Sequence, residues 1–300
     1  MKKAFDVPIL FLTYNRIDCA SEVFNQIKII KPKKLYFASN SAKENNPTDF
    51  KKIESVRSLI KEIDWDCNLH KRFLNQHLEV QDSISSSISW FFSNEKMGII
   101  LEDDCLPDLS FFDFCKSALD KYKDKKNVWM INGFNPNERD NFKSGCFLSR
   151  NPSVWGWATW KDRWENYSLN ISSINKKELR TRLNELFPRY VVNYYLKAYN
   201  DVESKRLRTW DYQAAFMIFM NNGYVVKPYR NLIKNIGIIG VHSNFQDENH
   251  CVETFTYKKT NMECKPDLDS DNWFFEKKIK FRLQKKIKYF IKRLSYEIFG

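Results

Sequence analysis

The first 104 residues alternate short apolar runs with longer segments of helical periodicity, and this alternation limits the possible folds more than any other feature. The apolar runs lie at 7–12, 35–38, 67–69 and 97–101. Between them, apolar residues recur every three or four positions over 17–29, 50–63 and 80–92. Strands separated by amphipathic helices are typical of a mainly parallel sheet with helices on its faces. We therefore predict an α/β fold whose first 104 residues form a nucleotide-binding half.

The chain beyond residue 105 is less regular. Its pattern predicts helices at 110–122, at 176–199 with a break at Pro188, and at 212–221, and extended segments at 127–131 and 224–226. We expect one domain over 1–245 with halves at 1–104 and 105–245, then a linker at 246–272 and a helix at 273–300.

The composition excludes several classes of protein. Only 8 of the 300 residues are glycine, and none lies in a G-x-G-x-x-G or G-x-x-x-x-G-K-[ST] pattern, which excludes the ordinary dehydrogenase and P-loop folds. The 7 cysteines are odd in number and contain no C-x-x-C pair, so we expect reduced thiols. No apolar run approaches about 18 residues, and the N-terminus lacks a secretory pattern. We expect a cytoplasmic chain without a spanning helix.

Three consecutive carboxylates, Glu102, Asp103 and Asp104, directly follow the strand predicted at 97–101. Ligands of an open parallel sheet bind outside the carboxyl ends of its strands. Acids packed together disfavour one another's ionisation, and a bound Mg²⁺ or Mn²⁺ removes that cost. The triplet therefore indicates a site for a divalent metal and a phosphorylated ligand. The alternative is a solvated loop before the helix at 110–122.

The first predicted strand ends in Thr13, Tyr14, Asn15 and Arg16. At this turn the helix N-terminus and the Arg16 guanidinium can face a nucleotide diphosphate, while the Tyr14 ring can stack on its base. Asn15 is equally explained as the N-cap of the following helix. Capping does not account for Tyr14 or Arg16.

These motifs and others downstream resemble a known family of enzymes. The segments that carry the resemblance are 8–16, 72–75, 99–107, 151–160, 209–213 and 227–231 with 240–242. In residues and order they resemble the family 2 type of GT-A nucleotide-sugar glycosyltransferase, and 102–114 is similar to the corresponding segment of N-acetylglucosaminyltransferase I and its bacterial relatives. The resemblance covers roughly residues 7–245. It implies a GT-A fold, a Rossmann-like, mainly parallel sheet with helices on both faces.

The resemblance also implies roles for single residues. Contacts to the nucleotide sugar would come from Thr13, Tyr14, Arg16, Asn40, Arg72, Glu102 and Asp103. Asp104 would bind the metal, and His242 would contact the metal or the diphosphate. Asp211 would be the general base, with a helix N-cap before 213–220 as its alternative. Asn40 departs from the acid that the family usually carries after the second strand, so the identity of the base stays open.

Four tryptophans follow one another closely, at Trp155, Trp157, Trp160 and Trp164. Aromatic faces pack well on sugar rings, and large aromatic side chains are equally suited to a core. We expect Trp155 and Trp157 to line an acceptor cleft and Trp160 and Trp164 to lie in the core.

The end of the chain is strongly basic. The whole chain has a formal net charge of +12, and within 273–300 nine basic residues against two acidic ones give +7. Apolar residues recur there at helical spacing, which is typical of an amphipathic helix that binds an anionic membrane surface. The alternative is a helix packed on the domain with a solvated cationic face.

Taken together, the residues and the resemblance predict an inverting, Mn²⁺- or Mg²⁺-dependent glycosyltransferase. It would move a sugar from a nucleotide sugar, foremost a UDP-sugar, to a hydroxyl of a glycan or lipid-linked acceptor in bacterial capsule, lipopolysaccharide or other surface-polysaccharide synthesis, at the inner face of the cell membrane. A metal-dependent nuclease or nucleotidyltransferase is an alternative, but it usually needs a second acidic group for a two-metal site. A nucleic-acid-binding protein would leave the acidic triplet unexplained.

Overall fold

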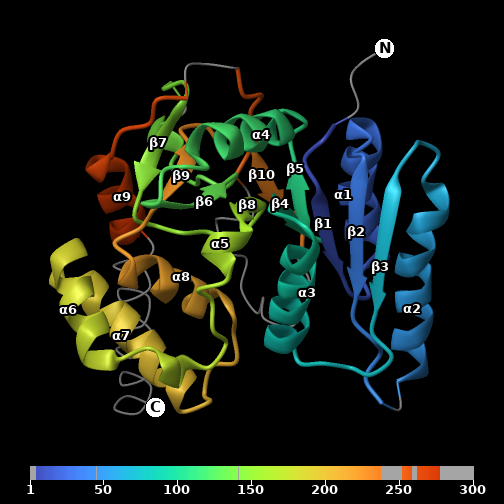
Figure 1. The fold of residues 1–300 in the computed structure, drawn as a ribbon, viewed down its shortest axis with the longest axis horizontal. Helices are drawn as coiled ribbons and strands as arrows, with labels where there is room; N and C mark the ends of the chain where they lie inside the picture. The colour runs from blue at the N-terminus through green and yellow to red at the C-terminus, as the bar shows by residue number, and fades with distance from the viewer. Residues whose placement is uncertain (1–4, 45, 141, 238–251, 259–261, 278–300) are drawn as a thin grey trace, which may run out of the picture.

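The computed structural model describes residues 5–44, 46–140, 142–237, 252–258 and 262–277, and within them an eight-stranded sheet forms the centre of the molecule (Figure 1). The strand order is β3-β2-β1-β4-β8-β6-β9-β7. The strands are β1 (Ile9–Thr13), β2 (Lys34–Ser39), β3 (Asn68–Phe73), β4 (Met97–Glu102), β6 (Val128–Asn132), β7 (Cys146–Ser149), β8 (Trp157–Trp160) and β9 (Tyr224–Pro228). Strands β1 to β4 are parallel, β8 is antiparallel to β4 and β6, β9 is parallel to β6, and β7 is antiparallel to β9. A separate pair joins β5 (Cys105–Pro107) to β10 (Ile233–Asn235).

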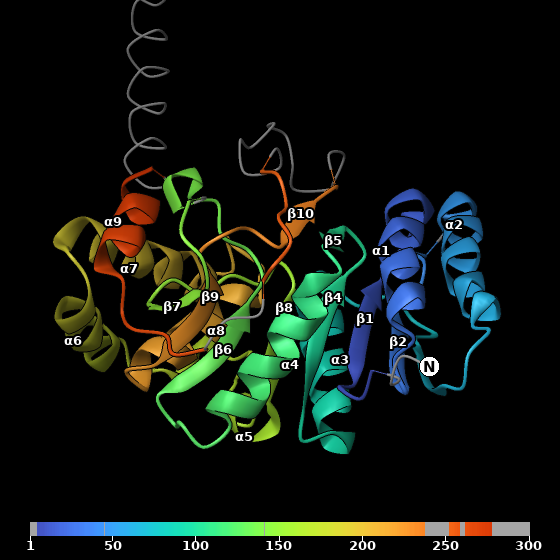
Figure 2. The ribbon, with the colours of Figure 1, turned by 90° about the horizontal axis from the view of Figure 1, so that it is seen from above.

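Helices cover both faces of the sheet. They are α1 (Ile17–Ile30), α2 (Pro47–Arg57), α3 (Val80–Asn94), α4 (Ser110–Tyr122), α5 (Lys161–Trp164), α6 (Lys176–Leu186), α7 (Arg189–Glu203), α8 (Asp211–Met220) and α9 (Leu268–Phe275). One buried cluster joins the sheet to α1, α2 and α4, and another joins it to α3, α5 and α8. Figure 2 shows α1 and α2 on one side of β1 and β2 and α3 on the other. The predicted α/β fold with helices on both faces is confirmed.

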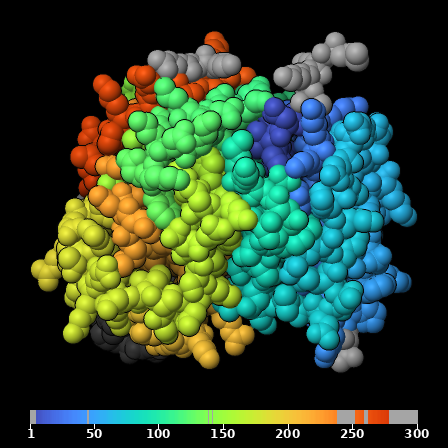
Figure 3. All heavy atoms as spheres, viewed as in Figure 1, coloured from blue at the N-terminus to red at the C-terminus, as the bar shows by residue number. Residues whose placement is uncertain are grey.

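The residues of β1 explain why helices pack on both faces of this sheet. All five are buried, and they alternate between the two clusters, with Ile9 and Phe11 in the first and Leu10 and Leu12 in the second. Successive side chains of a strand point to opposite faces, so a wholly apolar run needs packing on both sides. In the space-filling view the first half (blue to teal) lies beside the yellow to red part of the second half, with green segments between them (Figure 3).

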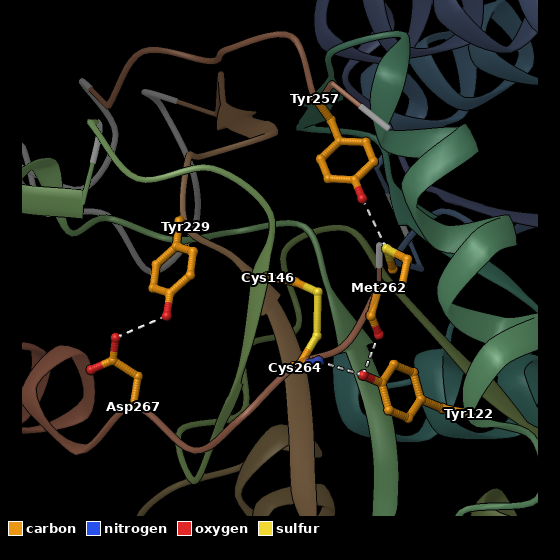
Figure 4. The surroundings of a disulfide bond; sticks show 7 residues. All are labelled: Tyr122, Cys146, Tyr229, Tyr257, Met262, Cys264 and Asp267. Carbon is orange, nitrogen blue, oxygen red and sulfur yellow. Dashed lines mark hydrogen bonds between the residues drawn. A yellow bond between two sulfur atoms is a disulfide. The ribbon is translucent and has the colours of Figure 1, made fainter. Parts of the chain in front are cut away.

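The expectation of reduced thiols is wrong for two cysteines, because Cys146 and Cys264 form a disulfide (Figure 4). The bond joins β7 to the segment 262–277 across 118 positions, a spacing that a search for close cysteine pairs does not reveal. Tyr122 fixes the same segment, since its hydroxyl donates to the Met262 carbonyl at 2.6 Å and accepts from the Cys264 N–H at 2.9 Å. Four of the described cysteines are free, namely Cys19, Cys67, Cys105 and Cys115.

The described part of 246–277 packs on the sheet and on α7. Asp271 of α9 accepts from the Ser149 hydroxyl at 2.5 Å and from the Arg150 N–H at 2.7 Å, and Phe275 lies in a third buried cluster with α6, α7 and α8. The predicted helix at 273–300 lies mostly outside the described residues. None of the helices that the structure describes has the length and apolar character needed to cross a membrane.

Candidate active site

The acidic triplet and the first turn meet at one edge of the sheet, as the sequence predicts. Strands β1 and β4 are parallel neighbours, with Leu12 opposite Glu102. The turn after β1 and the acids after β4 therefore leave the sheet side by side. This edge lies at the carboxyl ends of the strands, where open α/β sheets bind ligands.

Arg16 holds two of the three acids. Its guanidinium forms an ion pair with Asp103 and lies 3.0 Å, from Nη1 to Oδ2, from Asp104. Asp103 is buried and also accepts the Tyr14 N–H at 3.0 Å. The contacts of Asp103 fix the turn 13–16 against the end of β4.

The pKa values show how much negative charge gathers here. Burial, with Asp104 and Asp103 adding to it, raises the pKa of Glu102 well above its usual value, and Asp211 contributes in the same direction. Burial raises the pKa of Asp103 to about 6 against the opposing effect of Arg16. One guanidinium thus faces a group of acids that it does not neutralise, and a cation would favour the ionised carboxylates.

Asp104 is the acid best suited to touch such a cation. Its side chain is 16% exposed, and its contacts are Arg16 on Oδ2 and the weakly donating Cys105 thiol on Oδ1. Within the described ranges, no three His, Cys, Asp or Glu side chains are grouped so that they could hold a metal alone. Mg²⁺ is usually held by one or two carboxylates together with substrate phosphates and water, and this donor set fits that pattern. His242 lies outside the described residues.

Asp211 follows Trp210, which packs on the aromatic residues beside β4. Ile100 of β4 lies opposite Trp157 of β8, and the Trp157 ring stacks on Trp210 with 5.9 Å between centroids. Tyr167 donates to the Trp210 carbonyl at 3.3 Å. Trp210 is the N-cap of α8, so these contacts set where the helix begins and bring Asp211 close enough to affect the charge of Glu102.

The hydrogen bonds of Asp211 leave one of its oxygens available. Asp211 is the first residue of α8 and not its N-cap. Its Oδ1 accepts from the Thr209 hydroxyl and from the Tyr212 N–H at 2.9 Å. Oδ2 makes no hydrogen bond or ion pair with the residues that the structure describes. The bonds to Oδ1 therefore fix the orientation of the carboxylate, and Oδ2 remains available to accept a hydrogen bond or a proton.

Asp49 belongs to the site, and the sequence did not reveal it. From α2 it accepts the Tyr14 hydroxyl at 2.5 Å and the Asn15 amide. Burial would raise the pKa of Asp49, but these bonds outweigh it and lower the pKa. In the sequence Asp49 is an acid in the first turn of a helix, where acids are common, so its partners could not be foreseen. Asn15 is not the N-cap of α1, because the helix begins at Ile17 with Arg16 in the cap position, and the Asn15 amide donates to Asp49 instead.

Three residues predicted to contact the nucleotide sugar, Thr13, Asn40 and Arg72, differ in which of their hydrogen-bonding groups are already used within the protein. The Thr13 hydroxyl donates to the Ala38 carbonyl at 3.1 Å. The Asn40 amide is bonded at both ends, to the Leu78 carbonyl at 2.8 Å and from the N–H groups of Ser41 and Leu78. Arg72 donates from Nη2 to Ser86 at 3.4 Å, while its buried Nε has no partner among the described residues. Arg72 keeps its Nε–H and Asn40 keeps the second N–H of its Nδ2, whereas the Thr13 hydroxyl has already donated its one proton.

The tryptophans divide differently from the prediction. Trp160 and Trp164 are buried, which confirms their place in the core. Trp157 is only 1% exposed and lies in the cluster with α3 and α8, so it supports Trp210 instead of lining an open cleft. Trp155 is half-buried, edge-on to Phe134 at 4.6 Å.

Gly237 closes the edge beside the acids. The Ile236 N–H donates to the Asp104 carbonyl at 2.8 Å, which brings the next residue against the cluster. A Cβ at position 237 would lie 2.5 Å from Asp104 Oδ2 and 2.8 Å from Arg16 Nη1. Any larger residue at this position would therefore displace the side chains of Asp104 and Arg16, a restriction that only the folded backbone reveals.

No family model matches the chain, and no curated protein matches it. Among solved structures it is similar to the mannosyltransferase PcManGT from Pyrobaculum calidifontis in complex with GDP-Man and Mn²⁺, with a TM-score of 0.42 and 10% identity over 72% of this chain and 68% of that one. It is also similar to UTP-bound UGPase from Acinetobacter baumannii, with a TM-score of 0.40 and 8% identity over 94% of this chain and 98% of that one. A third similar structure is glucosyl-3-phosphoglycerate synthase from Mycobacterium tuberculosis in complex with Mn²⁺, uridine diphosphate and phosphoglyceric acid, with a TM-score of 0.31 and 9% identity over 52% of this chain and 56% of that one.

Proposed function

We propose that the chain is an inverting, metal-dependent glycosyltransferase of GT-A type that moves a sugar from a nucleotide sugar to an acceptor hydroxyl. One observation carries the proposal. Three carboxylates and Arg16 meet at the carboxyl ends of β1 and β4, and Asp211 lies close enough to raise the pKa of Glu102. A diphosphate ligand needs cationic groups at such an edge, and glycosyl transfer needs one further carboxylate as base.

The donor would bind along the turn after β1. Arg16 and the N-terminus of α1 would face the diphosphate, and Arg72 has a free donor to offer. The Tyr14 ring, whose hydroxyl Asp49 fixes, would stack on the base, which we propose is uracil. Glu102 and Asp103 would hold the ribose side. A divalent cation bound at Asp104 would supply a Lewis acid that stabilises the leaving diphosphate.

The chemical step follows from the free oxygen of Asp211. The acceptor hydroxyl oxygen would attack the anomeric carbon on the face opposite the diphosphate, and the bond from that carbon to the diphosphate oxygen would break. The hydroxyl proton would pass to Asp211 Oδ2, while Thr209 and the Tyr212 N–H hold Oδ1. A single displacement inverts the configuration at the anomeric carbon and forms no covalent intermediate.

A donor screen tests the activity. UDP-, GDP- and dTDP-sugars are incubated with the protein and Mn²⁺, and nucleoside diphosphate release is measured. We expect Asp211→Asn to lower the rate by about 10²- to 10⁴-fold, because the variant keeps the side-chain shape but cannot accept the proton. Asp120→Asn, on the exposed side of α4, is the control. Near-normal turnover by a folded Asp211→Asn protein would reject the base, and pyrophosphate release from nucleoside triphosphate and sugar phosphate would instead assign a nucleotidyltransferase.

Calorimetry tests the metal site separately from turnover. Asp104→Ala removes the exposed carboxylate of the cluster, so Mn²⁺-dependent binding of UDP should fall below detection while Asp120→Asn binds as the parent chain does. Unchanged binding by Asp104→Ala contradicts the assignment. Stabilisation by UDP with Mn²⁺, and none by an oligonucleotide, in a thermal shift assay would also reject the nucleic-acid alternative.

We place the reaction in bacterial capsule, lipopolysaccharide or other surface-polysaccharide synthesis, at the inner face of the cell membrane. The basic residues of 273–300 support this location, because a lipid-linked acceptor lies in an anionic surface that such a segment would bind. Trp155, half-buried beside Phe134, remains our candidate for the acceptor side.

A further inference from the structure

A cavity lies apart from the carboxylate cluster, and none of its lining residues belongs to β1, β4 or the turns that follow them. It has a volume of about 250 Å³ and is formed by the α5–α6 connection, the start of α6 and one side of α8. Its polar lining residues include Asn166, Ser168, Asn175, Glu178, Gln213 and Asn221. None of the residues assigned above to donor, metal or base lines it.

Gln213, which lines this cavity, carries an unsatisfied acceptor. The side chain is 2% exposed, and its Nε2 donates to the carbonyls of Thr209 at 2.8 Å and Leu169 at 3.3 Å. These two bonds settle which end of the amide is which. Oε1 is buried and has no partner among the described residues. Buried polar atoms are almost always hydrogen-bonded, so this oxygen calls for a donor that the chain does not supply.

The other groups at the cavity suit a neutral ligand with several hydroxyls. Asn175 uses Oδ1 to cap α6, which leaves its Nδ2 as a donor, and Asn221 uses Nδ2 on the Met217 carbonyl, which leaves its Oδ1 as an acceptor. Glu178 is exposed and makes no ion pair within the described ranges. Its negative charge disfavours phosphates and nucleotides. Met217 adds an apolar wall.

The size limits the ligand further. At about 30 Å³ for each water in the liquid, the cavity has the volume of roughly eight waters. That is room for one sugar ring, with its apolar C–H face and its hydroxyl edges, and because the cavity opens to the surface, any further units of a glycan would lie outside it.

We propose that this cavity binds a single neutral sugar unit, at a site separate from the donor site. One hydroxyl of the sugar would donate to Gln213 Oε1, and others would meet Asn175, Asn221 and Glu178. The site is linked to the candidate base, because Gln213 donates to the Thr209 carbonyl and the Thr209 hydroxyl donates to Asp211. The sugar would come either from a glycan chain or from free solution.

Ligand-observed NMR on the full chain tests the site without requiring turnover. Methyl glycosides of glucose, galactose, mannose and N-acetylglucosamine are titrated with UDP and Mn²⁺ present in excess, so that the donor site is closed to them. We expect saturable binding of at least one, with a Kd of about 1 to 10 mM. A disaccharide of that sugar that binds more tightly would point to a glycan chain as the source, and equal affinity would point to free sugar.

Two variants locate the binding. Gln213→Met removes the buried acceptor, and Glu178→Ala changes only an exposed side chain, so it stays informative if the first variant fails to fold. Each should weaken binding about tenfold or more, whereas Asn193→Ala, exposed on α7, should not. Absence of saturable binding for every sugar, or binding that both variants leave unchanged, overturns the proposal. Neither result depends on whether the donor screen finds a transferase.

Discussion

At the scale of single residues, the site depends on a few side chains held in place by neighbours that are distant in sequence. Arg16 is the centre of these contacts, because it binds both Asp103 and Asp104 and is itself kept charged by them. Burial would lower the pKa of Arg16, and the two carboxylates outweigh that effect and raise it. The two carboxylates therefore favour the charged form of the guanidinium.

Replacing Gly237 by alanine should disturb the ion pair between Arg16 and Asp104. An alanine Cβ there would come within 2.5 Å of Asp104 Oδ2 and 2.8 Å of Arg16 Nη1, so the ion pair must move. Both groups end in side-chain atoms with some freedom, so we expect the free energy of unfolding to fall by no more than about 1 to 2 kcal/mol. Binding of UDP with Mn²⁺ should weaken at least tenfold. Calorimetry on Gly237→Ala, with Asp120→Asn on the exposed side of α4 as the control, checks this, and unchanged affinity would contradict it.

The sequence predicted that the acids at the end of β4 and Arg16 after β1 belong to this edge, but it did not reveal the residues that hold them in place. Glu102 and Arg16 stand at the ends of apolar runs that are easy to recognise as strands, and parallel strands bring their carboxyl ends together. Asp49 and Gly237 carry no such signal, because their importance lies in contacts with residues 34 or more positions away. For Asn40 the base contact stays a prediction: its residue type suits that contact, and in the fold its Nδ2 donates to the Leu78 carbonyl while its Oδ1 accepts from the Leu78 N–H.

At the scale of elements, helices were predicted closely where their signals are local. Helix α4 spans the predicted 110–122, and Pro188 separates α6 from α7 as expected. Strands β7 and β8 were missed, because each has only four residues and β8 consists largely of tryptophan and small residues. Such short strands are defined by the partners they pair with and hardly by their own sequence.

The disulfide is the element-scale feature that most affects stability. It ties the segment 262–277, which carries α9, to β7 across 118 positions. A bond that closes so long a loop restricts the unfolded chain strongly, and a typical contribution is about 2 to 4 kcal/mol. We expect Cys264→Ser to lower the free energy of unfolding in urea by that amount, while Cys19→Ser, at a free half-buried cysteine, changes it by less than about 1 kcal/mol.

Adding a reductant to that experiment distinguishes the effect of losing the disulfide from the effect of replacing the Cys264 side chain. Reduction should destabilise the parent chain to the level of Cys264→Ser and should leave Cys264→Ser unchanged. If both proteins unfold at the same urea concentration without reductant, the bond does not stabilise the chain.

At the scale of the whole molecule, charge is divided between two places with different roles. The candidate active site gathers acids at the sheet edge, while nine basic residues lie in the last 28. The overall charge of +12 hides this division. Asp271 and the disulfide fix α9, which contains the first residues of this basic segment, to the sheet.

This division predicts that membrane binding and donor binding are separable. The full chain should sediment with vesicles that contain anionic lipid at low salt and far less with neutral vesicles, since each Lys or Arg near such a surface contributes about 1 kcal/mol. Raising the salt from 0.05 to about 0.5 M shortens the screening length and should release it. A chain ending at residue 277 should lose sedimentation yet bind UDP with Mn²⁺ as the full chain does. Equal sedimentation of both chains would place the membrane contact elsewhere, and loss of UDP binding on truncation would show that the last residues serve the site itself.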